Sequence, residues 1–317
     1  MLFRFAAVIP LLFACAAFAQ PEWPSKPVRI IVPSSPGGAT DLIGRLFAAH
    51  FSAALGQQFI VENRAGASGG VGYVVTAKSP ADGYTLVIAT TAITSLHIVL
   101  KDVQFDALRD FSPITQAVAS AQVLAVHPSI PVRNIAELVA LAKKSPDSLS
   151  FASPGEGSVP HLAVELLKSM AGIRMTHIPY KGVNPALIDV VGGHVAAIVV
   201  NVISAKPQID AGKLRALAVT SRKRAEALPK TPTIAEEGFK DYEALQWFGL
   251  LAPAGTPPRI ISRLHTLAVA ALRDPETRKR LAEEEPIGNS PEEFARIMKA
   301  EIEKWTRLAR NAGIKAI

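Results

Sequence analysis

The sequence predicts an α/β protein built on parallel sheets. Short apolar runs alternate with helical patterns along almost the whole chain, which is typical of parallel strands joined by crossover helices. No internal repeat or low-complexity tract interrupts this alternation. The expected strands are Val28–Val32, Phe59–Val61, Tyr84–Ala89, Val123–Val126, Leu149–Ala152, Met175–Ile178, Val195–Val200 and Leu214–Val219.

The first strand leads into a glycine-rich loop and then a helix. The apolar run Val28–Val32 ends at Pro33-Ser34-Ser35-Pro36-Gly37-Gly38, and a helical pattern follows through Leu42, Leu46, Phe47 and Leu55. A loop that opens a helix presents free backbone N–H groups, and the helix dipole favours an anion there. This segment therefore predicts a site for a carboxylate or phosphate that needs no charged side chain.

Later helices begin at recognisable start signals. Asn134 with Glu137, and Ser290 with Glu293, have the spacing of a capping box. Pro257, Pro275 and Pro291 fit the first turn of a helix. The last helix is expected from Pro291 to about Asn311. Its apolar stripe, which indicates packing against the core rather than against a membrane, comprises Phe294, Ile297, Met298, Ile302, Trp305 and Leu308.

Residues 1–19 have the features of a signal peptide. Arg4 precedes an apolar stretch that ends in Ala17-Phe18-Ala19, which predicts cleavage before Gln20 and export to the periplasm. The stretch around Cys15 faintly resembles a lipoprotein cleavage box, so lipidation there stays an alternative. Cleavage before Gln20 removes the only cysteine of the chain. The mature protein then has no disulfide, and its core must stabilise it.

Length and charge narrow the class of protein. The 317 residues suffice for about two domains, and no stretch after the leader is long and apolar enough to span a bilayer. The formal charge of +7 could suggest nucleic acid as a partner. The cations, however, are spread along helices beside acids, without a basic run interleaved with aromatic residues. We expect a solvated basic surface and no nucleic-acid partner.

The loops that follow the expected strands share one chemistry. Glycine, serine, threonine and asparagine dominate them, and Lys181 is their only cation. Open parallel sheets bind ligands at the carboxyl ends of their strands. The sequence thus predicts a hydrogen-bonding pocket formed by Pro33–Gly38, Thr90–Ser95, Ser153–Ser158, Tyr180–Asn184, Asn201–Ser204 and Thr220–Ser221.

Catalytic and cofactor motifs are weak. Gly66-Ala67-Ser68-Gly69-Gly70 satisfies the pattern of a nucleophile elbow, but four residues separate it from the preceding strand, whereas an elbow follows its strand directly. The same stretch is no complete dinucleotide loop, and the seven histidines lack metal-ligand spacing. We therefore expect no catalytic residue, no metal and no cofactor.

Several segments together resemble one family. They are Pro27–Asp41, Val61–Ala67, Pro80–Leu86, Gly157–Leu162, Pro179–Gly182, Gly212–Thr220, Trp247–Leu250 and Ala252–Pro257. In this order they resemble the Bug-type solute-binding receptors, the extracytoplasmic binding proteins of tripartite tricarboxylate transporters. The resemblance covers essentially the whole mature chain.

The resemblance implies a two-lobed Venus-flytrap protein of the type II periplasmic-binding class. One lobe would combine Gln20–Ala121 with Leu245–Ile317, and the other would span Gln122–Ala244. The hinge would lie near Val123–Val126 and Phe248–Leu251. Closure would trap a small organic acid between the lobes, without a chemical step.

The resemblance also implies the residues of the site. In this family, loop N–H groups, small hydroxyls and ordered water typically hold a carboxylate. Carried over, the binding residues are Ser35, Pro36, Gly37, Gly38, Asp41, Thr90, Thr91, Ser153, Gly155, Gly157, Ser158, His161, Tyr180, Lys181, Gly182 and Asn201. Asp41 is expected to organise its loop or a bound water, and Lys181 to be either a ligand contact or a solvated cation.

Two departures from the family pattern concern the ligand. Val159-Pro160 stands where small hydroxyl residues are expected before His161, and Val200 stands where many relatives have an acid before Asn201. Both remove polar groups from the pocket, which favours a plain carboxylic acid with an apolar or aromatic body. The expected partners are this acid and the membrane subunits of a transporter, with the receptor a monomer. A receptor that docks to a signalling membrane protein, and a serine hydrolase using Ser68, remain alternatives.

Overall fold

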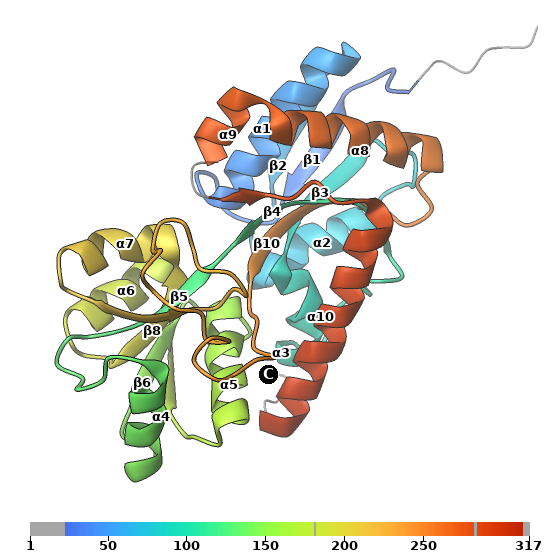
Figure 1. Cartoon of the computed structure of the whole chain (residues 1–317). Helices are drawn as coiled ribbons and strands as arrows, with labels where there is room; N and C mark the ends of the chain where they lie inside the picture. Colours follow the sequence, from blue (N-terminus) through green and yellow to red (C-terminus); the bar gives the residue numbers. More distant parts are fainter. Residues whose placement is uncertain (1–22, 181, 282–283, 313–317) are drawn as a thin grey trace, which may run out of the picture.

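The computed structural model describes residues 23–180, 182–281 and 284–312 (Figure 1). The predicted signal peptide and Lys181 lie outside the described residues. The described chain forms two sheets with helices packed around them. In this part of the chain, no helix combines the length and the apolar character that crossing a membrane requires.

The first sheet has the strand order β11-β4-β10-β3-β1-β2. Its strands are β1 (Val28–Val32), β2 (Phe59–Asn63), β3 (Thr85–Thr90), β4 (Phe111–Ser120), β10 (Gln246–Pro253) and β11 (Glu285–Pro286). The chain segments that form it also contain α1 (Ala39–Leu55), η1 (Ala67–Gly69), α2 (Gly70–Ala77), η2 (Thr91–Thr94), α3 (Leu96–Val99), α8 (Pro258–Arg273), α9 (Pro275–Leu281) and α10 (Pro291–Ala312). Because β1, β2 and β3 are parallel, the loops that follow them emerge at one edge.

The second sheet has the strand order β7-β6-β8-β5-β9. Its strands are β5 (Gln122–Val126), β6 (Ser150–Ser153), β7 (Thr176–Pro179), β8 (Ala197–Asn201) and β9 (Arg215–Val219). The helices between them are α4 (Ile135–Lys144), α5 (Val159–Ala171), α6 (Val183–Val191) and α7 (Val202–Asp210). The eight predicted strands are all present, with ends that differ from the prediction by no more than two residues.

The expectation of parallel sheets was too simple, because both sheets are mixed. β10 runs antiparallel to β3 and β4 in the first sheet. β5 runs antiparallel to β8 and β9 in the second. β5 and β10 are the strands that the chain enters directly after its two crossings between the sheets.

The chain crosses between the sheets twice. β4 ends at Ser120 and β5 begins at Gln122, so the first crossing is at Ala121, two residues before Val123. The second lies in residues 220–245, between β9 and β10, and ends shortly before Phe248. Both crossings are near the segments expected at the hinge, Val123–Val126 and Phe248–Leu251, which pair within one sheet each, and the hinge itself stays a prediction. We retain the division into lobes at Ala121 and Ala244 as a proposal.

The last helix joins the two halves. Figure 1 shows α10 running from the first sheet down to α5, against which it packs. Phe294, Met298, Trp305 and Leu308 are buried on one face, as the apolar stripe predicts. One core cluster therefore contains residues of α10, of the first sheet and of α5.

Candidate functional site

The loop after β1 is organised by Asp41, which is only 4% exposed. Its carboxylate accepts hydrogen bonds from the Gly37 N–H (3.0 Å), the Asn63 amide (2.9 Å) and Arg45 Nε (2.8 Å). The bond from Arg45 is the main reason why the pKa of Asp41 falls to about 2, against the opposing effect of burial. The predicted organising role of Asp41 agrees with these contacts. The Gly37 N–H is already used within the loop.

Ser35, Pro36, Gly37 and Gly38 form the exposed tip of this loop. Gly38 precedes the first turn of α1 and has an extended conformation without a side-chain cap. The loop lies at the sheet edge that also carries the turn after β2. None of the four residues lines a cavity described below.

The glycine-rich stretch after β2 forms a strained turn. Ala67 and Ser68 have φ values of 46° and 53°, in the left-handed region that residues other than glycine seldom adopt. Residues 64–66 separate β2 from η1, so Ser68 does not follow its strand directly, unlike the serine of a nucleophile elbow. Within the described residues Ser68 makes no hydrogen bond to a histidine. Strain of this kind gathers at ligand-binding turns as well as at active sites.

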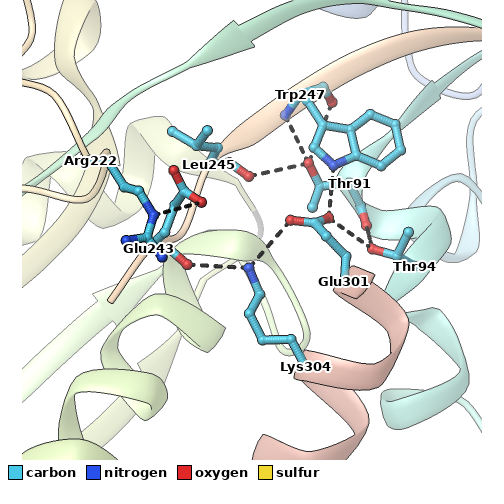
Figure 2. A network of polar contacts seen from close by, with 8 residues as sticks. All are labelled: Thr91, Thr94, Arg222, Glu243, Leu245, Trp247, Glu301 and Lys304. Carbon is cyan, nitrogen blue, oxygen red and sulfur yellow. Dashed lines mark hydrogen bonds and ion pairs between the residues drawn. The ribbon is translucent and has the colours of Figure 1, made fainter. Parts of the chain in front are cut away.

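Thr90 and Thr91 are used to build the sheet edge. The Thr90 hydroxyl lies 3.2 Å from the Tyr73 hydroxyl and accepts the Ala92 N–H (3.3 Å). Thr91 is fully buried, and its hydroxyl accepts the backbone N–H of Trp247 (2.8 Å; Figure 2). Neither threonine lines a cavity described below. Direct ligand contact by either stays a prediction, and the burial of Thr91 argues against it.

In the second sheet, serine hydroxyls of the loop after β6 form hydrogen bonds with the backbone of the same loop. The Ser153 hydroxyl is buried and donates to the Gly155 carbonyl (3.0 Å). The Ser158 hydroxyl also donates to that carbonyl (2.7 Å) and caps α5 by accepting the His161 N–H (3.4 Å). These bonds shape the loop and leave fewer donors for a ligand than the sequence suggests.

The side chain of His161 forms a hydrogen bond with the backbone of the same loop. Its Nδ1 accepts the Gly157 N–H (3.1 Å), so the neutral ring carries its proton on Nε2. The ring stacks on His177 with a centroid distance of 3.9 Å. Burial, and then the neighbouring His177, lower the pKa of His161 to about 3, and burial lowers that of His177 to about 4. His161 therefore positions the loop as an uncharged side chain.

The other predicted residues of this sheet face elsewhere. The Tyr180 hydroxyl donates to Asp189 of α6 (2.6 Å), and burial together with this contact raises its pKa to about 12. The Gly182 N–H donates to the Pro154 carbonyl (3.2 Å). Asn201 caps α7 by accepting the Ile203 N–H (2.8 Å). Ligand contacts by these residues stay predictions.

The two halves meet where α3 approaches the loop before α5. The Ser95 hydroxyl donates to the Gly157 carbonyl (3.2 Å). A β-carbon on Gly157 would stand 2.5 Å from Val99 Cγ2, so only glycine allows this approach. A cavity of about 160 Å³ opens beside this contact. It is lined by Ser68, Ala92, Leu96, Val99, Glu156, Gly157, Ser158, Val159 and Gln246.

Only Gly157 and Ser158 of the predicted residues line this cavity. Ser68 and Gln246 also line it but are not among the residues predicted to bind a ligand, and Glu156 lies in the predicted pocket loop Ser153–Ser158. Within the described part of the chain, the side chains of Ser68 and Gln246 form no hydrogen bond, and the backbone N–H groups of Glu156 and Val159 have no acceptor. Ser68 belongs to the glycine-rich motif Gly66–Gly70, but the residue pattern does not reveal its left-handed backbone conformation. No feature of the sequence distinguishes Gln246.

Each crossing between the sheets has an acid nearby, half-buried Glu284 at the first and buried Glu301 at the second. At the first, Glu284 accepts a hydrogen bond from the Ser120 hydroxyl. Burial raises the pKa of Glu284 to about 7, although the side chain of Asn201 lowers it. Near the second, Glu301 of α10 accepts from Trp247 Nε1 (2.7 Å) and Thr94 (3.3 Å; Figure 2). Burial raises the pKa of Glu301 as well.

Lys304 extends the network around Glu301 to the second crossing. Its ammonium group donates to Glu301 (3.4 Å) and to the carbonyl of Glu243 (3.2 Å), whose carboxylate pairs with Arg222 at 3.6 Å (Figure 2). The last helix is thus tied to the segment that joins the two sheets. Among the described residues, no group of His, Cys, Asp and Glu side chains could hold a metal ion.

Comparison with known proteins identifies the family. The family model of the Tripartite tricarboxylate transporter family receptor matches residues 43–314. The chain belongs to this receptor family. Protein BugT of Bordetella pertussis is similar to this receptor, with 35% identity over 321 residues, 98% of each chain.

Two solved structures extend the comparison. A protein of R. palustris solved with adipate is 38% identical, with a TM-score of 0.80 over 93% of this receptor and 100% of that chain. MatC of Rhodopseudomonas palustris, with bound malate, is 28% identical, with a TM-score of 0.76 over 90% of this receptor and 100% of that chain. These structures and other periplasmic binding proteins confirm the two-lobed α/β fold that the sequence predicts.

Proposed function

We propose that this receptor binds a small carboxylic acid in the cavity between its lobes and delivers it to the membrane subunits of a tripartite tricarboxylate transporter. The supporting observation is the cavity itself, whose walls come from both lobes and from β10. The adipate and malate complexes of the two similar proteins support carboxylate as the ligand class.

Apart from the exposed side chain of Glu156, the groups that line the cavity suit a carboxylate held by neutral donors. The N–H of Val159 opens α5, so the dipole of a 13-residue helix adds to its attraction for an anion. The Glu156 N–H, the Ser68 hydroxyl and the Gln246 amide supply further donors from three separate segments. A carboxylate bridging them would link the lobes and favour their closed arrangement.

Export and partners complete the proposal. The signal peptide is removed before Gln20, and the mature receptor works in the periplasm as a monomer that docks to its transporter. Copurification of tagged receptor with the transporter's membrane subunits tests delivery. Copurification with a sensor kinase alone would instead favour the signalling alternative.

A thermal-shift screen tests the binding function. Mature receptor is heated with mono-, di- and tricarboxylates, aromatic acids, amino acids and nicotinamide. A ligand at about one hundred times its Kd adds roughly 2.7 kcal/mol to the stability of the folded state, which raises the Tm by several degrees. A selective shift with a carboxylic acid is expected. A shift confined to amino acids would contradict the assignment of a plain acid, and a flat screen would contradict carboxylate binding.

The variant Ser68→Ala separates binding from catalysis. It keeps the β-carbon, and therefore the strained turn, but removes the hydroxyl of a residue that lines the cavity. We expect weaker binding of the selected acid than in the control Ser262→Ala, which changes an exposed serine of α8. Esterase turnover in the wild type that Ser68→Ala abolishes would instead support the hydrolase alternative.

A further inference from the structure

We infer that the acid carries an apolar body, which this receptor binds in a second cavity of the first lobe, between α2 and α3. This inference rests on the proposed function, because it places the carboxylate of the same ligand in the cavity between the lobes. The second cavity adds selectivity for the rest of the ligand.

The second cavity is the larger and the more apolar of the two. Its volume is about 350 Å³, compared with about 160 Å³ for the cavity between the lobes. The larger volume falls within the range of about 300–1,000 Å³ that is typical of small-molecule sites. The residues that line it are Ala67, Gly70, Val71, Val74, Val75, Leu96, Leu100, Asp102, Val103, Gln104 and Phe105.

The two cavities share a wall. Leu96 lines both, and the neighbouring residues Ala67 and Ser68 line one cavity each. The strained turn after β2 therefore borders the apolar cavity with Ala67 and the cavity between the lobes with Ser68. A molecule with a carboxylate at one end and a hydrocarbon at the other matches this division, with its two parts on either side of Leu96.

The polar groups of the second cavity disfavour a second carboxylate. Asp102 is exposed at this cavity and would repel another negative charge. The Gln104 side chain is engaged by Lys78 at 3.3 Å. The Lys78 ammonium offsets part of the Asp102 charge, so the mainly apolar lining is what favours an aliphatic or aromatic monocarboxylate over a dicarboxylate such as adipate.

A series of straight-chain acids tests this inference. Butanoate, hexanoate and octanoate are titrated into mature receptor by calorimetry, beside adipate, which has the same six carbons as hexanoate. Burying a methylene group strengthens binding by at most about fourfold, so Kd should fall two- to fourfold per added methylene. Hexanoate should bind more tightly than adipate.

Two variants locate the effect. Val74→Trp fills the cavity, and Val71→Asp places a charge at a side chain that is 43% exposed, in the first turn of α2 where an acid suits the helix dipole. Both variants should bind adipate and butanoate like the wild type. Their Kd should no longer fall as methylene groups are added to the acid. The control Ile188→Asp, at a residue 68% exposed on α6, should keep that gain.

The outcomes separate this inference from the proposed function. A Kd that does not change with chain length, or a chain-length gain that survives in Val74→Trp and Val71→Asp, would overturn the second cavity while carboxylate binding stands. Failure of these four acids and of every carboxylic acid in the thermal-shift screen would overturn the proposed function itself. Circular dichroism and Tm of each variant confirm that the protein compared is folded.

Discussion

Replacing Gly157 with alanine tests whether the contact between α3 and the loop before α5 is part of ligand binding. The new β-carbon would lie 2.5 Å from Val99 Cγ2 and 2.6 Å from Cγ1, whereas carbon atoms in contact normally lie about 3.5–4.0 Å apart. Gly157 also has a φ of +69°, which itself disfavours alanine. A second variant is therefore needed to separate the clash from the backbone strain.

Gly172→Ala is the matched control. Gly172 ends α5 with a φ of +63°, close to that of Gly157, and a β-carbon there would meet no heavy atom within 4 Å. Both variants should lose about 1–2 kcal/mol of unfolding free energy to left-handed strain. Overpacking costs a further 1–3 kcal/mol where the structure cannot yield. Gly157→Ala can avoid that cost only by separating α3 from the loop.

Binding should therefore distinguish the two variants. If closure on the ligand requires the contact, Gly157→Ala must restore it at a cost of about 1–3 kcal/mol, which weakens binding by about 5- to 150-fold. Calorimetry with the acid that gives the largest thermal shift measures this, and denaturant unfolding measures stability. A Kd for Gly157→Ala within twofold of that for Gly172→Ala would refute the reasoning.

Three other predictions concern buried polar groups. Folding raises the pKa of Glu284 from 4.5 to about 7, so its contribution to stability is complete below pH 4.5 and is lost as pH rises through 7. In denaturant unfolding, the unfolding free energy of the wild type should fall by up to about 3 kcal/mol between pH 5 and 8.5. That of Glu284→Gln should not show this fall. Folding lowers the pKa of His161 from 6.5 to about 3, so its contribution to stability is complete above pH 6.5 and is lost as pH falls towards 3. His161→Asn should therefore unfold at a lower pH than the wild type. An unchanged midpoint of acid unfolding would contradict this. Asp41→Asn should lower the free energy of unfolding by about 1 kcal/mol in denaturant unfolding, because the bond to Arg45 and the shape of the loop both depend on the carboxylate. Arg45→Met leaves the Gly37 and Asn63 contacts in place and should lower it less.

The sequence predicts the strands well where they are apolar throughout. Val28–Val32 matches β1 at both ends because all but one of its side chains are buried. The ten-residue β4 was missed because Pro113, Thr115 and Gln116 break its apolar pattern. Thr115 and the Gln116 backbone are satisfied by Asn289, which lies more than 170 residues along the chain. No local pattern reveals a buried polar residue whose partner is so distant.

The sequence predicted only part of the candidate site, because contacts between distant segments decide which residues line the cavity. Loop composition correctly indicates the sheet edges that approach each other, and two predicted residues, Gly157 and Ser158, line the cavity there. Gln246 could not be predicted, because its place depends on how β10 enters the first sheet beside β3 and β4. Residue types show which groups can bind an anion, but the docking of one lobe on the other decides which of them reach it.

In the glycine-rich loops after β1 and β6, a side chain of the same loop or the following helix accepts one of the backbone N–H groups. Fewer N–H groups are therefore free to bind a ligand than the loop sequences suggest. In each loop a glycine N–H is accepted by the side chain four residues later, Gly37 by Asp41 and Gly157 by His161. Each loop therefore keeps its shape through a bond of its own, whether or not a ligand is bound. Less conformational entropy then remains to be lost on binding, which improves affinity. In the second of these loops the N–H groups of Glu156 and Val159 have no acceptor within the described residues, so they remain available to the proposed carboxylate.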